Sequence, residues 1–356
     1  MPMTVLSLAY PFAVVGPNSV GGAEQILTEL DQGLVKAGHR SLVIACMGSS
    51  ATGKLLALPA FNYRTEVERE RLWRRAHVEH AVSEALAAND VDLIHVHDLN
   101  FHEYRLPYEV PVLVTLHMPI SWYPADVWRR LPANVMLQCV SDSQRRTLPP
   151  HLKDVAIIPN GVELHDTVEE RRDFALVLGR ICPEKNQHEA LEAGFQAATP
   201  VVIGGKVFPW KAHTDYFHER LMPLLNEARG GVQHRYCGPL PEGRKRRLLA
   251  QAKCLLHPTL APETSSLVGM EALAAGTPVI AYRSGALPEI VDDGVTGFLV
   301  SNAGEMAEAI KQLGKIRHED CRAAAEERFS RERMVRQYLS LYAGILRNRV
   351  PETMHA

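Results

Sequence analysis

Two carboxylates mark the most informative stretch of the chain, which reads APETSSLVGMEALAAGTPVIAYRSG over residues 261–285. Glu263 is followed by small polar residues and an apolar helix start, and Glu271 comes eight residues after it. A carboxylate ahead of a helix N-terminus is well placed to hold sugar hydroxyls, and the first N–H groups of that helix can receive an anion. The second carboxylate lies about two helical turns further along. This pattern predicts a site for a sugar attached to a phosphate.

Two cations occur together in a second stretch, GRICPEK at residues 179–185, directly after an expected strand. Arg180 offers a fork of donors and Lys185 a compact charge, so the pair can meet a diphosphate on a strand-to-helix loop. The alternative is a solvated loop with ordinary surface charges, because exposed Arg and Lys are common.

The first half of the chain offers glycines and histidines. Gly21 and Gly22 lie between the first strand and the first helix, where they let the backbone approach a ligand closely; a simple turn is the alternative. His117 ends one expected strand, and His95 and His97 lie on another, which places imidazoles on the same rim. A structural role for these histidines is the other interpretation, and no spacing resembles a zinc site.

Two further patterns are interpreted as structural. Asp90-Val91-Asp92 matches the Asp-x-Asp pattern that can hold a divalent ion, but it precedes a strand and so lies at the wrong end of the sheet. The basic residues between Arg69 and Arg75 surround Trp73 and could touch an anionic membrane surface. Interspersed glutamates favour a solvated helix face instead, so peripheral membrane contact is the weaker alternative.

Composition restricts the class of protein. The chain has 356 residues, 46% of them apolar and 22% charged, which predicts a globular protein with two ordinary domains. Its formal net charge of −2 argues against a general nucleic-acid binder. The six cysteines are far apart and are interpreted as reduced, mostly buried thiols. No apolar run reaches the length of a membrane span and no secretion signal is recognised, so we expect a cytoplasmic protein.

Short apolar runs alternate with longer helical patterns along the whole chain. The expected strands are residues 5–8, 41–46, 93–96, 112–116, 136–140, 174–178, 200–203, 232–236, 253–256, 278–281 and 298–300. This alternation predicts an α/β fold with two doubly wound, Rossmann-like domains that face a central cleft, and ligands at the carboxyl ends of the strands. The pattern pauses near residues 162–172, which predicts domains at 1–165 and 166–329. A final helix at about 330–347 is expected to pack back on the first domain.

In combination and in order, these motifs resemble the retaining glycosyltransferases of family 4, which have the GT-B fold. The matching segments are GGAE near the start, LIHVHD, TLH at 115–117, IPNGVE at 158–163, LGRICPEKN at 178–186, CGPL at 237–240 and residues 262–300. The last segment is the most specific, and the resemblance covers most of the chain.

The resemblance implies roles for individual residues. It implies catalytic roles for His117, Arg180, Lys185 and Glu263, with His117 beside the donor sugar. It implies donor binding by Gly21, Gly22, Arg180, Lys185, Gly238, Glu263, Ser265, Ser266, Leu267, Val268 and Glu271. Among these, Glu263 would bind sugar hydroxyls, Glu271 the ribose and the two cations the diphosphate. Family members commonly carry Phe-Gly or a similar pair at positions 265 and 266, so the two serines put the sugar identity in question.

These observations predict a transferase that moves a hexosyl group from a nucleotide-diphosphate sugar to an acceptor with retention. The acceptor class stays open among small molecules, glycans and lipid-linked molecules, and the oligomeric state is unassigned. No cofactor or metal is expected, because fixed cations and helix amides would stabilise the leaving diphosphate. The alternatives are a catalytically silent nucleotide-sugar-binding module, or a phosphorolytic or epimerising enzyme of the same fold. Turnover assays with and without inorganic phosphate separate these alternatives.

Overall fold

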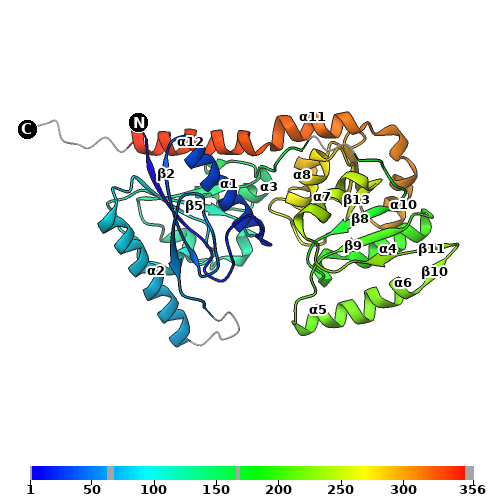
Figure 1. The fold of residues 1–356 in the computed structure, drawn as a ribbon, viewed down its shortest axis with the longest axis horizontal. Coiled ribbons are helices and arrows are strands. Elements are labelled where there is room, and N and C mark those ends of the chain that lie inside the picture. Colours follow the sequence, from blue (N-terminus) through cyan, green and yellow to red (C-terminus); the bar gives the residue numbers. More distant parts are fainter. Residues whose placement is uncertain (1, 62–67, 166–168, 349–356) are drawn as a thin grey trace, which may run out of the picture. The chain divides into compact units, whose positions relative to one another are not determined.

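The computed structural model describes residues 2–61, 68–165 and 169–348 of the chain (Figure 1). The chain divides into two compact units. The first unit comprises residues 1–160 together with the C-terminal segment from residue 332, and the second unit comprises residues 161–331. Each unit contains one large sheet of parallel strands.

The first unit is built on a seven-stranded sheet in the order β3-β2-β1-β4-β5-β6-β7. Its strands are β1 (Thr4–Leu8), β2 (Arg40–Cys46), β3 (Lys54–Leu58), β4 (Leu93–Val96), β5 (Val112–Leu116), β6 (Val135–Cys139) and β7 (Ala156–Ile157). All the residues of β1, β4 and β5 are buried. This continuous burial is typical of central parallel strands covered on both faces.

The helices of the first unit are α1 (Gly22–Lys36), α2 (Glu68–Ala88), the short α3 (Asp142–Arg146) and α12 (Arg331–Arg347). Helices α1, α2 and α12 bury apolar residues, whereas the short α3 is wholly polar and buries Gln144. In α1, Ile26, Leu27, Leu30 and Leu34 are buried at helical spacing, as the sequence pattern predicts.

Helix α12 contributes two buried tyrosines to the core of the first unit. The Tyr342 hydroxyl lies 2.7 Å from Nδ1 of His95, and the Tyr338 hydroxyl donates to Oε1 of Gln138 at 2.8 Å. Nε2 of His95 lies 2.8 Å from the Thr115 hydroxyl. Hydrogen bonds with Tyr338 and Tyr342 thus satisfy buried polar atoms of Gln138 and His95 on the sheet. They hold α12 against strands that are distant from it in sequence.

The second unit is built on a six-stranded parallel sheet in the order β12-β9-β8-β13-β14-β15. Its strands are β8 (Ala175–Leu178), β9 (Val201–Gly204), β12 (Arg235–Tyr236), β13 (Cys254–His257), β14 (Val279–Tyr282) and β15 (Gly297–Val300). A separate hairpin joins β10 (Ala228–Arg229) to β11 (Val232–Gln233).

Helices connect the strands of the second unit and also follow its last strand. The longer ones are α4 (Gln187–Gln196), α7 (Glu242–Gln251), α8 (Leu267–Ala274), α10 (Ala303–Lys311) and α11 (His318–Phe329), of which α10 and α11 follow the last strand. Shorter segments are η5 (Pro183–Lys185), α5 (Lys211–Tyr216), η6 (Phe217–Leu221), α6 (Met222–Asn226) and α9 (Leu287–Ile290). The predicted doubly wound α/β fold is confirmed in both units.

Several details of the predicted sheets were wrong, and the short strands β7 and β10 were not predicted. The expected strand at 232–236 is divided at His234 between the β10–β11 hairpin and β12. His234 leaves the strand pattern because its Nδ1 accepts the N–H of Val201 on β9 at 3.0 Å. Strand β3 was missed, since Leu and Ala in KLLAL carry little of the β-branched signal that marks strands.

Candidate functional site

The strand order of each sheet indicates where a ligand site is expected. In the second unit the chain proceeds outward in one direction from β8 and in the other from β13, and these two strands are neighbours. In open parallel sheets, ligands bind outside the carboxyl ends of the strands where the order reverses. The segments that follow β8 and β13 are residues 179–186 and 258–266, which contain the predicted Arg180, Lys185 and Glu263.

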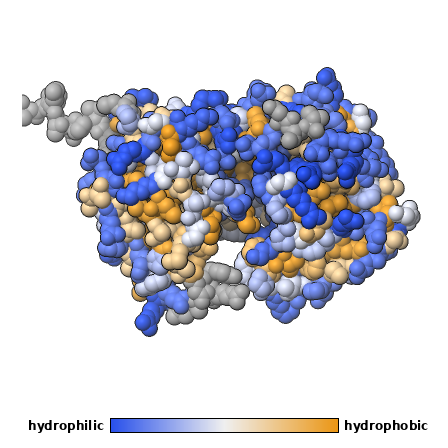
Figure 2. Space-filling view, in the orientation of Figure 1, coloured by the Kyte–Doolittle hydropathy of each residue, from blue (hydrophilic) through white to orange (hydrophobic). Residues whose placement is uncertain are grey.

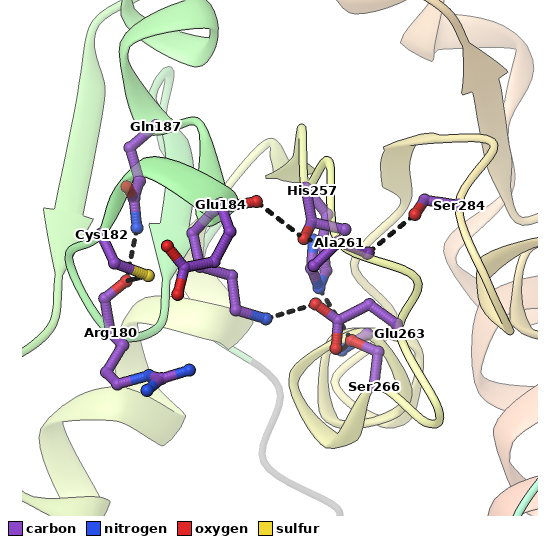
Figure 3. A network of polar contacts seen from close by, with 12 residues as sticks. Arg180, Cys182, Glu184, Gln187, His257, Ala261, Glu263, Ser266 and Ser284 are labelled. Atoms are coloured by element: carbon purple, nitrogen blue, oxygen red, sulfur yellow. Dashed lines mark hydrogen bonds and ion pairs between the residues drawn. The ribbon is translucent and has the colours of Figure 1, made fainter. Parts of the chain in front are cut away.

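The segment after β13 ends in a capped helix. The Ser266 hydroxyl accepts the N–H of Gly269 at 3.2 Å, so α8 begins at Leu267. His257, the last residue of β13, supports this cap with Nε2 at 3.0 Å from the same hydroxyl (Figure 3). The Ser266 side chain is thus engaged in capping. The N–H groups of Leu267 and Val268 remain available to a ligand, because first-turn amides have no intrahelical acceptor.

The two loops at the switch point are joined by an ion pair. Lys185, at the end of η5, donates from Nζ to Oε1 of Glu263. The side chains are 23% and 14% exposed, so this pair is largely removed from solvent but reachable. The sequence placed a cation for the diphosphate and an acid for the sugar on separate segments, and the structure brings them into contact.

Backbone contacts hold the two loops in this arrangement. The carbonyl of Glu184 accepts the N–H of Leu260 at 2.9 Å, and the carbonyl of Glu263 accepts the N–H of Ala286 at 2.8 Å. Gly285 has φ +55°, and an added Cβ would lie 2.2 Å from the Glu263 carbonyl oxygen. The Gly-containing turn before α9 therefore allows the close approach that supports Glu263.

Opposing effects determine the charge of Glu263. Burial would raise the pKa of its carboxyl, but the Lys185 charge and hydrogen bond and the charge of His257 lower the pKa below its ordinary value. Burial lowers the pKa of His257 to about 4. At neutral pH the site thus contains an ionised glutamate beside a neutral histidine.

Glu271 on α8 forms a second acid–cation pair. Lys245 on α7 donates to Oε1 of Glu271 at 2.8 Å and also contacts Glu242 at 2.9 Å. Burial raises the pKa of Glu271, and the Lys245 charge partly opposes this effect. Its buried Oε2 and the buried hydroxyl of Ser265 have no hydrogen-bond partner among the described residues. Buried polar atoms without partners are rare, and here two of them belong to predicted donor-binding residues.

Arg180 and Gly238 complete the predicted set in the second unit. Figure 3 shows the Arg180 guanidinium extending from its loop toward the side where Glu263 and Ser266 lie. Among the described residues no carboxylate forms an ion pair with it, while its carbonyl accepts from the Gln187 side chain at 2.6 Å. Gly238 follows β12 with φ +69°, a conformation that favours glycine.

In the first unit, the predicted glycines lie at the start of α1. Gly21 occupies the N-cap position in extended conformation, and α1 begins at Gly22. A Cβ added to Gly21 would lie 1.9 Å from a carboxylate oxygen of Glu24, so this acid folds back over the glycine. Burial raises the pKa of Glu24, the last residue of the GGAE motif.

His117 and His97 meet at the carboxyl ends of β5 and β4, as their positions predicted. Nδ1 of His97 lies 2.9 Å from Nε2 of His117, and the rings stack with centroids 5.2 Å apart. Burial lowers the pKa of His117 to about 4, so both rings are neutral near pH 7. His95 is instead engaged with Tyr342 and Thr115 in the core, which is a structural role.

Asp92 has the structural role that its position indicated. It lies directly before β4, and its carboxylate accepts the N–H of Thr4 at 2.7 Å, at the amino ends of β1 and β4.

Figure 2 shows a hydrophilic surface at the lower tip of α2, where the helix begins. Arg71 pairs with Glu68 at 2.8 Å, and Arg75 pairs with Glu79 at 2.8 Å. This pairing of charges is typical of a solvated helix face. Within the described residues, no helix is both long and apolar enough to cross a membrane.

Sequence reasoning missed two residues that shape the site. Lys245 belongs to the basic run Arg244–Arg247, which has the composition of a solvated helix face, yet its Nζ neutralises Glu271. His257 supports the α8 cap and had no motif of its own. The only available signal was its position, since it ends a strand at the expected switch point.

Two family descriptions match nearly the whole chain. Glycosyl transferases group 1 matches residues 165–330, and Glycosyltransferase Family 4 matches residues 20–166. The α-maltose-1-phosphate synthase of Mycobacterium tuberculosis is 25% identical over 353 residues, covering 84% of each chain. The phosphatidyl-myo-inositol mannosyltransferase of Mycolicibacterium smegmatis is 26% identical, covering 87% of this chain and 85% of its own.

Solved structures share the fold over the full length. Sucrose-phosphate synthase from Thermosynechococcus elongatus has a TM-score of 0.76 at 19% identity and covers 97% of this chain and 100% of its own. AviGT4, a glycosyltransferase involved in avilamycin A biosynthesis, has a TM-score of 0.71 at 23% identity and covers 98% and 99%. Anabaena HepE, solved with UDP and glucose, has a TM-score of 0.73 at 18% identity and covers 96% and 100%.

Proposed function

The chain belongs to the family 4 glycosyltransferases, which have the GT-B fold, and from this premise we propose that it transfers a hexosyl group from a nucleoside-diphosphate sugar to an acceptor hydroxyl with retention. The observation that carries this proposal is the contact between Lys185 and Glu263 beside the start of α8. That contact gathers a cation for phosphate, an acid for sugar hydroxyls and helix amides for an anion within one site.

The unpartnered atoms of the second unit support a nucleotide as the ligand. The buried Oε2 of Glu271 and hydroxyl of Ser265 lack partners among the described residues. Ribose hydroxyls are donors that a carboxylate oxygen can accept, and a serine hydroxyl can donate to phosphate or sugar oxygens. The complex of HepE with UDP and glucose supports a sugar nucleotide as the class of donor.

In the proposed reaction the glycosidic bond to the β-phosphate breaks and negative charge gathers on the leaving diphosphate. Arg180, Lys185 and the N–H groups of Leu267 and Val268 stabilise this charge without reorganising, so no metal is required in the step. Glu263 is already paired with Lys185, which makes it a poor nucleophile. We therefore propose front-face attack, in which the leaving phosphate accepts the proton of the acceptor hydroxyl. The roles of His117 beside the donor sugar and of Gly21 and Gly22 in donor binding stay predictions from the sequence.

A donor screen followed by product analysis tests this proposal. A nucleotide sugar that binds the native state should raise the melting temperature by mass action. With that donor and a panel of hydroxyl acceptors, the product should have the anomeric configuration of the donor by NMR. Binding without any turnover would instead support a silent module. Turnover that requires inorganic phosphate, or yields an epimer, would support the other alternative.

A further inference from the structure

Three metal-ligating side chains lie together on the second unit beside the loop that carries Arg180 and Lys185. They are Cys182 and Glu184, around the start of η5, and His213 on α5. One ligand atom from each lies within 4.8 Å of the other two. Figure 3 shows the Glu184 carboxylate turned toward the Cys182 sulfur.

Burial distinguishes this cluster from ordinary surface groups. The Cys182 side chain is fully buried and that of His213 is 6% exposed. Nδ1 of His213 is buried and has no hydrogen-bond partner among the described residues. Trp210 covers the imidazole with ring centroids 4.7 Å apart. A buried ring nitrogen without a partner, on an imidazole grouped with a thiol and a carboxylate, is typical of a site that can bind a ligand.

The chemistry of the three ligands selects the ion. A thiolate, an imidazole and a carboxylate together suit Zn²⁺, which takes four ligands in tetrahedral geometry. With bonds of about 2.0–2.3 Å, tetrahedral ligands lie about 3.3–3.8 Å apart, so closing the cluster takes side-chain shifts of about 1 Å. The charges of thiolate and carboxylate would balance the ion, which makes burial of the group acceptable. On binding, the thiol proton passes to solvent.

We propose that Cys182, Glu184 and His213 bind a zinc ion that fastens α5 to the η5 loop, with water as the fourth ligand. The ion takes no part in glycosyl transfer. The ion would hold the η5 loop in place. This loop already contacts the segment after β13, because the carbonyl of Glu184 accepts the N–H of Leu260. Fixing Glu184 from its side chain as well would restrict the loop that presents Lys185.

The site was not visible from sequence spacing. Cys182 and Glu184 are close in sequence, but His213 comes from a helix thirty-one residues after the cysteine. The proposal is independent of the proposed function, since it concerns ion binding by the protein without donor.

Cobalt titration of the chelator-treated full chain tests the proposal. Co²⁺ should bind at one equivalent with a thiolate-to-cobalt charge-transfer band in the near ultraviolet, and Zn²⁺ should remove this band by competition. Binding should also quench Trp210, which is the only tryptophan of the second unit.

Cys182→Ser should abolish the band, while the matched control Cys237→Ser, on a half-buried thiol outside the cluster, should keep it. His213→Gln should weaken Zn²⁺ binding by more than about 100-fold, because even changes outside the ligand shell cost about 10–100-fold. If circular dichroism shows that Cys182→Ser is unfolded, the Zn²⁺ affinity of His213→Gln tests the proposal instead, and an unchanged affinity overturns it. Absence of the band in the wild-type protein, or an equal band in a folded Cys182→Ser, overturns the proposal.

Discussion

Replacing Lys185 by alanine removes the cation from a largely buried pair and leaves the Glu263 carboxylate alone. Breaking a fully buried ion pair costs about 3–5 kcal/mol, mostly because one charge is left without compensation. Here the two side chains keep 23% and 14% of their exposure, so water can reach the carboxylate. We therefore expect Lys185→Ala to lower the free energy of unfolding of the second unit by about 1–3 kcal/mol near neutral pH.

The pH dependence of this loss follows from the pKa of Glu263. In the wild type, burial would raise this pKa but Lys185 holds it below the ordinary value, so the stabilisation is present above the unfolded-state pKa and is lost as the pH falls through the folded-state pKa. Without Lys185, burial dominates and raises the pKa of Glu263. The variant therefore regains stability once Glu263 is protonated, because no uncompensated charge is then buried. The difference between the two proteins should be full at neutral pH and shrink as the pH falls through the raised pKa of the variant and then the lowered pKa of the wild type, which lie on either side of about 4.3, the ordinary value for glutamate.

The assay is urea unfolding of the intact chain followed by hydrogen exchange in peptides spanning β8 and β13, which reports on the second unit by itself. Lys253→Ala is the matched control, because Lys253 forms a more exposed pair with Asp173 at 3.0 Å and should change stability by less than about 1 kcal/mol. The reasoning would be refuted if the loss in Lys185→Ala were the same at neutral pH as at a pH below about 4.3. A loss no larger than that of the control would also refute it.

Three further substitutions test other parts of the structure. Glu271→Gln should weaken binding of the donor nucleotide about tenfold or more in calorimetry, because one carboxylate oxygen that can accept from the ribose is replaced by an amide nitrogen; unchanged affinity would exclude the ribose role. Ser266→Ala should lower the free energy of unfolding by about 0.5–2 kcal/mol through loss of the α8 cap, measured by thermal unfolding, and an unchanged melting temperature would contradict this cap. Tyr342→Phe should cost about 1–3 kcal/mol by leaving Nδ1 of His95 without its partner, and a neutral effect in urea unfolding would mean that α12 contributes nothing there.

Much of the fold could be predicted because parallel strands and amphipathic helices leave a periodic signal. The pattern around Ile26 and Leu34 identified α1, and the buried runs of β4 and β5 were recognised at their observed bounds. Strand β3 lacks that signal. The division of β11 from β12 depends on the hydrogen bond from the N–H of Val201 to Nδ1 of His234. Such a contact is a property of the assembled sheet, which no local pattern contains.

The candidate site shows the same division between local and tertiary information. Motif order located Lys185 and Glu263, but their ion pair depends on the neighbouring positions of β8 and β13. The partner of Glu271 was hidden because Lys245 lies in a basic run that resembles any exposed helix face. His95 and His117 have similar settings in the sequence, and only the position of α12 shows that His95 is structural.

Release of nucleoside diphosphate from saturating donor and acceptor measures the central claim most directly, with Arg180→Ala and Lys185→Ala compared with the wild type. If these cations stabilise the leaving diphosphate, each substitution should lower kcat by about 100-fold or more, as loss of a preorganised donor does elsewhere. Circular dichroism should show both variants folded. Arg180→Lys should keep only part of the wild-type activity, because an ammonium group lacks the paired N–H donors of the guanidinium. A folded Arg180→Ala, Lys185→Ala double variant with wild-type kcat would contradict the account.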